Sequence, residues 1–395
     1  MNKYKNVTQF DVQGKTVLVR VDFNVPITRT GRIMNDTRLV SHLPTIRFLM
    51  ENGAKTVLMS HFGRPDSAQD TTYSLQKVAK YLEGLLHTTV HFSPDTIGAK
   101  AQEAKKALQP GEVLLLENTR FCSGETSNDQ TYAKQLAQGC DIFINDAFAT
   151  CHRAHASTVG VTSFIKERGI GLLMKQEMEA LTKVMQSPSH PFVVIIGGAK
   201  VSSKFNILHR FAKMADHLMI GGAMANTFLA AHGHEIGRSI YEQDMIAKAS
   251  DILAEAAEHN CRVHLPQDVV IAKALKQDEP CRVVEVDGVT EDHMILDIGP
   301  NTVKSWQHTI KKASTILWNG PVGAFETIPF NHGTNALVMA LADAEAYVLA
   351  GGGDTINAIA GVRREQAFDY ISTGGGALLE YLEGIELPAL QALNN

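Results

Sequence analysis

The sequence predicts an α/β fold with two lobes, each a mostly parallel β-sheet flanked by helices. Short runs rich in β-branched residues alternate with amphipathic stretches of ten or more residues, which is typical of repeated βα units. The alternation is present in both halves of the chain, and 395 residues suffice for about two domains that each bury a core. We therefore expect two lobes of similar construction.

The first lobe, residues 1–170, contains a series of strand candidates. Between them lie stretches with helical spacing of apolar residues and good helix formers, and several of these end at glycine, as helices commonly do. The expected strands are 15–26, 55–65, 89–93, 112–121 and 141–150, and the expected helices are 38–53, 74–87, 95–108 and 129–139.

A long uninterrupted helical pattern at 171–186 is expected to connect the two lobes, with Gly169 and Gly171 as its hinge. The second lobe follows at 187–377 and repeats the alternation of strands and helices. Its expected strands are 191–198, 217–222, 262–271, 314–323 and 346–355.

The composition excludes several classes of protein. With 37 Lys and Arg against 42 Asp and Glu, the net charge is −5, which argues against non-specific nucleic-acid binding. The longest apolar runs, such as 192–196, are far short of the roughly eighteen residues that a membrane span needs, and no secretory signal is visible. Five cysteines without a C-x-x-C pair fit reduced thiols, so we expect a cytoplasmic protein that binds neither membrane nor nucleic acid.

The charge is divided unevenly between the halves. Residues 1–170 carry 20 Lys and Arg against 16 Asp and Glu (+4), while residues 171–395 carry 17 against 26 (−9). This division favours an anionic ligand held mainly by the first lobe, although chance variation in surface charge explains the totals equally well.

The residues that follow the expected strands also differ between the lobes. Open α/β sheets bind ligands beyond the carboxyl ends of their strands, so these residues are the candidates for a site. In the first lobe they are charged or polar, and in the second they are glycine. The first set is Asp22, Asn24, His61, Arg64, Arg120 and Arg153, and the second is Gly197, Gly198, Gly221, Gly222, Gly320, Gly323 and Gly351 to Gly353.

Basic side chains of the first lobe predict a pocket for a small anion. The planar guanidinium of arginine matches phosphate and carboxylate groups bidentately, and a compact ligand with two anionic ends would suit several such groups. The alternative is that each arginine is a solvated surface residue. The set is Arg38, His61, Arg64, Arg120 and Arg153.

Glycine-rich segments of the second lobe predict phosphate binding, because glycine before a helix lets backbone N–H groups approach a phosphate closely. They are 197–205, 351–361 and 372–384. Asp354 is either a Mg²⁺ ligand or a helix N-cap. Lys200 and Lys204, four apart on one expected helical face, are either phosphate-binding groups or a solvated pair.

Familiar signatures of other classes are missing. Gly14-Lys15-Thr16 resembles the end of a P-loop, but Gln9 stands where the first glycine belongs and the segment enters a strand. No glycine cluster completes G-x-G-x-x-G, which disfavours a dinucleotide dehydrogenase. Cys151 with the nearby histidines lacks a further ligand group at metal spacing, so a nucleophile or metal set there is disfavoured as well.

Taken together, segments in order along essentially the whole chain closely resemble the phosphoglycerate kinase family. The match is highly specific because so many motifs occur in the family's order. They are VRVDFNVP (19–26), SHFGRP (60–65), LLLENTRF (114–121), HRAHAST (152–158), GGAKVSSK (197–204), LDIGP (296–300), WNGPVGAFE (318–326), AGGGDT (350–355) and STGGGA (372–377).

The resemblance implies two Rossmann-like lobes joined by a hinge helix, with residues 378–395 returning to the first lobe. It implies a phosphotransferase of glycolysis with a carboxyl group as acceptor, which converts 1,3-bisphosphoglycerate and ADP into 3-phosphoglycerate and ATP, reversibly and with Mg²⁺. We expect a monomer in which in-line transfer occurs in a hinge-closed cleft.

The resemblance also implies roles for individual residues, with Arg38 and Lys200 as the catalytic pair and Asp354 as the metal ligand. The 3-phosphoglycerate site falls on Asp22, Phe23, Asn24, Arg38, His61, Phe62, Gly63, Arg64, Arg120 and Arg153. The nucleotide site falls on Lys200, Lys204, Asn319, Glu326, Gly352, Gly353, Asp354, Thr355, Gly374, Gly375 and Gly376.

Three positions depart from the family's usual pattern. Ser203 stands where many members have Asp, Phe62 replaces the commoner Leu, and Cys151 replaces a small residue. Only Ser203 lies near the expected chemistry. Two alternative functions are a non-catalytic protein that clamps an anionic metabolite in a hinge cleft, which would need no Gly-Asp loop, and a kinase for another small carboxylate.

Overall fold

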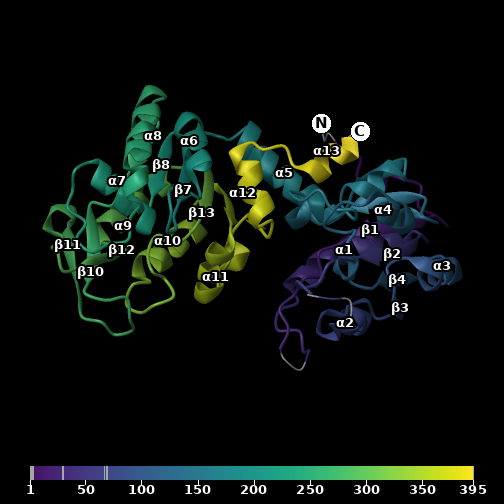
Figure 1. Ribbon diagram of the computed structural model, residues 1–395. Helices are drawn as coiled ribbons and strands as arrows, with labels where there is room; N and C mark the ends of the chain where they lie inside the picture. The colour runs from purple at the N-terminus through teal and green to yellow at the C-terminus, as the bar shows by residue number, and fades with distance from the viewer. Residues whose placement is uncertain (1–3, 29–30, 66, 68–69, 395) are drawn as a thin grey trace. The chain divides into compact units, whose positions relative to one another are not determined.

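The computed structural model describes residues 4–28, 31–65, 67 and 70–394, and the chain divides into two compact units (Figure 1). The first unit comprises Met1–Glu179 and Ile385–Asn395, and the second comprises Ala180–Gly384. The boundaries expected from the sequence are at 170, 186 and 377, and the assignment of residues 171–186 as a separate connector stays a prediction. That the first lobe binds 3-phosphoglycerate and the second binds the nucleotide stays a prediction.

The first unit is built on a six-stranded sheet with the order β3-β4-β2-β1-β5-β6, in which every neighbouring pair is parallel. The central strands are buried on both faces, as expected for a parallel sheet covered by helices. The strands are β1 (Thr16–Arg20), β2 (Lys55–Met59), β3 (Val90–Ser93), β4 (Val113–Leu116), β5 (Ile142–Asn145) and β6 (Glu167–Ile170).

Helices of the first unit pack apolar faces on this sheet. On the first helix, Ile46 follows Leu39 by seven residues and Leu49 follows Ile46 by three, so the three side chains share one face of the helix. All three are fully buried in the core. The helices are α1 (Thr37–Glu51), α2 (Gln76–Leu86), α3 (Gly98–Ala107), α4 (Gln130–Ala137) and the terminal α13 (Pro388–Asn394). Helix α5 (Leu172–Gln186) begins in the first unit and ends in the second.

The second unit has a parallel six-stranded sheet with the order β15-β14-β13-β7-β8-β9. Its strands are β7 (Phe192–Ile196), β8 (His217–Ile220), β9 (Arg262–His264), β13 (Thr315–Asn319), β14 (Tyr347–Gly351) and β15 (Tyr370–Ser372). The helices are α6 (Phe205–Met214), α7 (Ala223–Ala231), α8 (Ile246–Glu258), α9 (Pro300–Ile310), α10 (His332–Ala342), α11 (Gly353–Val362) and α12 (Gly376–Glu383).

A separate three-stranded antiparallel sheet in the second unit is absent from the sequence prediction. Its order is β11-β10-β12, with β10 (Asp268–Ala272), β11 (Cys281–Glu285) and β12 (Met294–Ile298). The single strand expected at 262–271 is wrong, because β9 and β10 are separate strands. Pro266 lies between them and cannot donate a backbone hydrogen bond to a continuing ladder.

The two glycines expected at the hinge have packing reasons of their own. Gly169 lies in β6, where a Cβ would stand 2.2 Å from the carbonyl oxygen of Lys5. Gly171 directly precedes α5, and a Cβ there would stand 2.0 Å from Oδ1 of Asp146. Their hinge role stays a prediction.

The α/β fold with two parallel sheets is confirmed. No helix among the residues that the structure describes is both long and apolar enough to cross a membrane.

Candidate active site

Residues predicted to bind the anionic ligand follow four neighbouring strands of the first sheet. Asp22, Phe23 and Asn24 follow β1, and the segment from His61 to Arg64 follows β2. Arg120 and Arg153 follow β4 and β5. Because these strands are parallel, their carboxyl ends meet at one edge of the sheet.

Hydrogen bonds join several of these residues into one group. Nη1 of Arg38 donates to Oδ2 of Asp22 and to the carbonyl oxygen of Asn24, both at 3.0 Å. The side-chain oxygen of Asn24 accepts from the N–H of Gly63 at 2.9 Å, and the carbonyl of Gly63 accepts from Nη1 of Arg120. The ends of β1, β2 and β4 are thereby tied to the start of α1.

A cavity of about 390 Å³ lies beside this group. Three guanidinium groups line it, and none of its described lining residues carries a carboxylate, so the cavity suits an anion. Its lining residues are Arg64, Pro65, Arg120, Cys122, Ser123, Thr126, Arg153 and His155. The structure thus brings three of the predicted arginines around one cavity, while Arg38 joins them through Asn24 and Gly63.

His61 lies against the buried Arg20, with Nη2 of the arginine 3.2 Å from Nδ1 of the histidine. Since a guanidinium only donates hydrogen bonds, Nδ1 accepts, and the hydrogen of the neutral ring is on Nε2. Burial, followed by the charges of Arg20 and Arg120, holds the pKa of His61 well below its usual value. His61 is therefore a neutral hydrogen-bond donor at pH 7.

Two of the predicted residues have buried aromatic side chains. The ring of Phe23 is fully buried, and that of Phe62 packs edge-on against Tyr73. Their main-chain groups are bonded within the protein as well, so both residues form the buried support of the site. Gly63 follows with φ 59°, a left-handed conformation, and a Cβ there would stand 2.1 Å from the ring of Tyr73, so both backbone and space require glycine.

Asn118 holds this part of the site together and was missed by the sequence analysis. Its Oδ1 accepts from the N–H groups of Phe62 and Arg120, both at 3.0 Å, and its Nδ2 donates to the carbonyl of Phe62 at 2.7 Å. The side chain is fully buried. The available signal was a polar residue two positions after a four-residue buried strand.

Behind the site, Glu125 compensates the buried charge of Arg20. The carboxylate of Glu125 accepts from the N–H and the hydroxyl of Ser157, at 3.0 and 2.5 Å, while Nε of Arg20 donates to the same hydroxyl oxygen at 2.8 Å. Burial, Arg20 and further arginines lower the pKa of the nearby His155 to about 4, so this cavity residue is neutral as well.

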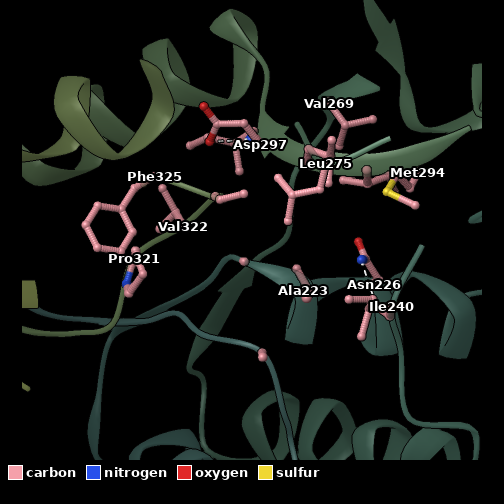
Figure 2. A pocket seen from close by; sticks show the side chains of 18 of the residues that line it. Ala223, Asn226, Ile240, Val269, Leu275, Met294, Asp297, Pro321, Val322 and Phe325 are labelled. Carbon is pink, nitrogen blue, oxygen red and sulfur yellow. Dashed lines mark hydrogen bonds between the residues drawn. The ribbon is translucent and has the colours of Figure 1, made fainter. Parts of the chain in front are cut away.

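The second unit contains a larger cavity of about 610 Å³, shown in Figure 2. Apolar side chains of the antiparallel sheet, of the segments after α7 and β10 and of the loop after β13 surround it. The sequence did not predict this cavity, because the antiparallel sheet was not expected. The apolar side chains include Ile240, Val269, Leu275, Met294, Val322 and Phe325. Of the predicted nucleotide residues, the exposed Glu326 and Asp354 line this cavity.

Glycine loops after three parallel strands pack against one another beside this cavity. Gly222 precedes α7 with φ 72°, and a Cβ there would stand 2.6 Å from the carbonyl oxygen of Gly198 and 3.0 Å from that of Pro321. All three residues line the cavity. Only glycine permits this approach, which leaves main-chain groups and a helix N-terminus at the cavity wall.

The expectation that Lys200 and Lys204 share a helical face is wrong, because α6 begins only at Phe205. Lys204 is the N-cap residue, and its Nζ donates to the carbonyl oxygens of Gly197 and Asn319, at 2.7 and 3.1 Å. Burial lowers the pKa of Lys204 to about 8. Lys200 is exposed in the turn before the helix, and the hydroxyl of Ser203 donates to its carbonyl oxygen at 2.9 Å.

Asn319 and Thr355 are buried and bonded to neighbouring loops. Nδ2 of Asn319 donates to the carbonyl of Gly351 at 2.8 Å, and Oγ1 of Thr355 accepts from the N–H of Gly320 at 2.7 Å. These bonds connect the ends of β13 and β14. Both side chains therefore hold together the loops that follow β13 and β14.

Asp354 is not a helix N-cap, since that position belongs to Gly352, and Asp354 lies in the first turn of α11 with its carboxylate exposed. Among the residues that the structure describes, no three His, Cys, Asp or Glu side chains are grouped to hold a metal. Mg²⁺ commonly binds through one or two carboxylates completed by phosphate oxygens and water, and a single exposed carboxylate beside a cavity fits that mode.

Gly374 to Gly376 follow β15, which pairs with β14 at the sheet edge where Gly352 and Gly353 lie. Gly375 and Gly376 are exposed at the start of α12.

Cys151 is buried, and burial raises the pKa of its thiol to about 12, which makes it a poor nucleophile at neutral pH.

Comparison with known proteins decides the family. A family model described as phosphoglycerate kinase matches residues 7–385. The chain belongs to the phosphoglycerate kinase family. The resemblance drawn from the motifs is thereby confirmed, and so is the class of enzyme, a phosphotransferase.

Individual phosphoglycerate kinases are similar over their whole length. The enzyme of Herpetosiphon aurantiacus is 45% identical over 395 residues, covering 100% of both chains, and that of Rhodospirillum centenum is 46% identical, covering 99% of each. The structure of phosphoglycerate kinase from Coxiella burnetii superposes with a TM-score of 0.93 at 40% identity, covering 99% of this chain and 98% of that one. This family membership does not favour the non-catalytic clamp.

Proposed function

We propose that this protein transfers a phosphoryl group reversibly between 1,3-bisphosphoglycerate and ADP, giving 3-phosphoglycerate and ATP, as a step of glycolysis. The observation that carries the proposal is the group of arginines at the carboxyl edge of the first sheet. Arg64, Arg120 and Arg153 line one cavity, and hydrogen bonds connect Arg38 to it. Membership of the phosphoglycerate kinase family supports the substrate.

In this proposal the first unit binds 3-phosphoglycerate. The three cavity arginines would hold its phosphate, because guanidinium groups bind phosphate bidentately. Asp22, Asn24 and the N–H donor of His61 would bind the hydroxyl and carboxylate end, near Arg38. Phe23, Phe62 and Gly63 would support the site through their main-chain bonds to its side chains and loops.

The second unit would bind the nucleotide. The apolar cavity suits a base, and the carboxylate of Glu326 at its wall suits ribose hydroxyls. Phosphates would meet Lys200, Lys204 and the N-termini of helices that begin at glycine. Asn319 and Thr355 would hold the loops of Gly352 and Gly353, and Gly374 to Gly376 would face the transferred group.

Asp354 would hold Mg²⁺ together with the phosphate oxygens of the nucleotide. When bound, the ion neutralises phosphate charge during transfer. Asp354 supplies one carboxylate, and no group of three metal-binding side chains is present among the described residues, so binding of the ion is expected to depend on the nucleotide.

The reaction needs no general base, because the acceptor carboxylate is already ionised at neutral pH. The protein's task is to position two anions and to stabilise the charge of the transferred group, which Arg38 and Lys200 are suited to do. Since the two ligands are assigned to different units, in-line transfer requires closure about the hinge, which also excludes water.

The deciding experiment measures ATP formed from ADP and 1,3-bisphosphoglycerate by the purified protein with Mg²⁺. A non-catalytic protein that only binds an anionic metabolite would form no ATP. A kinase for another small carboxylate would prefer glycerate or 2-phosphoglycerate over 3-phosphoglycerate in the reverse direction, which would contradict the proposal. We further propose a cytoplasmic monomer, and light scattering of the purified protein tests the oligomeric state.

A further inference from the structure

His42 and Asp146 form a buried pair directly behind the proposed anion site. His42 lies on α1, one turn after Arg38, and its Nδ1 is 3.0 Å from Oδ2 of Asp146. Both side chains are almost completely buried, with exposed fractions of 2% and 0%. The proposed mechanism uses neither residue.

The other ring nitrogen of His42 accepts a hydrogen bond from the main-chain N–H of Asp22, with a distance of 2.9 Å. An accepting nitrogen carries no hydrogen, so the hydrogen of the neutral ring is on Nδ1 and is donated to Asp146. Only this tautomer satisfies both contacts. The ring of Phe23 packs edge-on against the imidazole, 5.7 Å between centroids, which limits rotation of the ring.

Asp22 connects His42 to the proposed anion site. Its carboxylate pairs with Arg38, whose side chain is 39% exposed and, among the residues that the structure describes, pairs with no other side chain. His42 and Arg38 are on the same helix, so Asp22 is held by α1 at two points: its main chain by His42 and its carboxylate by Arg38. A displaced Asp22 would change the direction of the guanidinium.

The same pair also contacts the helix that runs from the first unit into the second. Oδ1 of Asp146 accepts from the N–H of Met174 at 3.1 Å, and Oγ1 of Thr45 on α1 accepts from the N–H of Leu172 at 2.8 Å. The first turn of α5 is thus bonded to α1 directly and to Asp22 through Asp146 and His42.

We propose that His42 is a positioning residue for the transfer reaction: with Asp146 it holds the main chain of Asp22 so that the carboxylate of Asp22 orients Arg38. The inference rests on the proposed function, in which Arg38 stabilises the charge of the transferred group. The bond of His42 to the main chain of Asp22 is the one that leads from the pair to Arg38, so the effect of His42 on the reaction passes through Asp22.

The test compares His42→Ala, His42→Gln and His42→Asn with the wild-type full-length protein. The amide of Gln reaches the position of Nε2 and keeps an acceptor for Asp22, while the amide of Asn reaches only the position of Nδ1 and keeps a donor for Asp146. In the assay with ATP and 3-phosphoglycerate, we expect Ala and Asn to lower kcat about 10- to 100-fold, the range for a misplaced catalytic group. KM for ATP should stay unchanged, and Gln should recover most of kcat.

Lys105→Met is the matched control, because it removes a buried ammonium that donates to the carbonyls of Leu136 and Gln138 elsewhere in the first unit. It should lower the melting temperature and leave kcat near wild type. If Gln and Asn fold and have equal kcat, or if all His42 variants match Lys105→Met, the proposal is overturned. Wild-type protein without 3-phosphoglycerate kinase activity would instead overturn the proposed function.

Nitrogen-15 spectra of histidine-labelled wild-type protein test the tautomer without any activity measurement. We expect His42 to show a protonated Nδ1 and an unprotonated Nε2. The opposite tautomer would leave Asp22 without its acceptor and would overturn the positioning role even if the enzyme is active.

Discussion

Arg38 and Asp22 form an ion pair in which Nη1 of the guanidinium lies 3.0 Å from Oδ2 of the carboxylate. The carboxylate is nearly buried, whereas the arginine side chain is partly exposed. The pair joins the loop after β1 to the first turn of α1. A cation is therefore held in place at the sheet edge where the anionic ligand is proposed to bind.

The first prediction concerns Arg38→Ala. We expect kcat to fall about 10²- to 10³-fold, because the variant removes a preorganised charge that acts on the transition state. Folding should be intact, since the N–H of Asn24 still donates to the other oxygen of the Asp22 carboxylate, at 3.3 Å. Steady-state kinetics and circular dichroism measure the two quantities.

Arg47→Ala is the control for that variant, as Arg47 lies on the same helix but donates to the carbonyl of Leu85. It should turn over normally. Near-normal turnover of Arg38→Ala would remove Arg38 from the proposed mechanism.

The second prediction concerns Asp354→Ala. Calorimetric titration should show Mg-ATP binding weakened by at least about tenfold, since loss of a metal-site partner typically has an effect of this size or larger. Affinity for 3-phosphoglycerate should be unchanged. Asp343→Ala, which removes the partner of Arg364 elsewhere in the second unit, is the control and should leave both affinities unchanged. Equal Mg-ATP binding by both variants would show that Asp354 holds no metal.

The third prediction concerns proton uptake by Lys204. Burial lowers its pKa to about 8, so above that pH the amine is largely neutral in the free protein. Bound phosphates favour the charged form and raise the pKa, so ATP binding at about pH 8.5 should take up protons. Calorimetry in two buffers with different ionisation enthalpies measures this uptake. Lys204→Arg, which stays charged, should abolish it; the same enthalpy in both buffers for the wild type would contradict the prediction.

The fourth prediction concerns Asp297, a buried cavity residue whose carboxylate accepts from the N–H groups of Gly333 and Ile298, at 2.7 and 2.9 Å. Burial raises its pKa to about 7, above the ordinary value of an unfolded Asp. Between about pH 4 and pH 7 the folded protein therefore binds more protons than the unfolded chain, so this group's contribution to stability falls as pH rises.

The slope approaches about 1.4 kcal/mol per pH unit for one such proton. Asp297→Asn should remove this group's contribution to the pH dependence of the free energy of unfolding, which urea unfolding at a series of pH values from 5 to 8 measures. The exposed Asp343→Asn serves as the comparison and should keep the wild-type slope. An unchanged slope in Asp297→Asn would refute the assignment.

Local patterns explain why the sequence predicted that Arg64 and Arg120 lie together. Each follows an apolar run, and parallel strands bring such positions to one edge. Asn118 was missed because its role consists of contacts with Phe62 and Arg120, and only the fold brings Phe62 near it. The helical face assigned to Lys200 and Lys204 was wrong, because a turn of the same residues precedes α6.

The sequence by itself determined the succession of βα units, the family and the kinds of group at the strand ends, since these depend on neighbours along the chain. The tertiary structure decided which groups meet: Arg38 with Asp22, His42 with Asp146, and the antiparallel sheet with the glycine loops of the second unit. The physical reason is that such contacts depend on strand order. In the first sheet, β1 lies between β2 and β5, and alternating elements alone do not specify that arrangement.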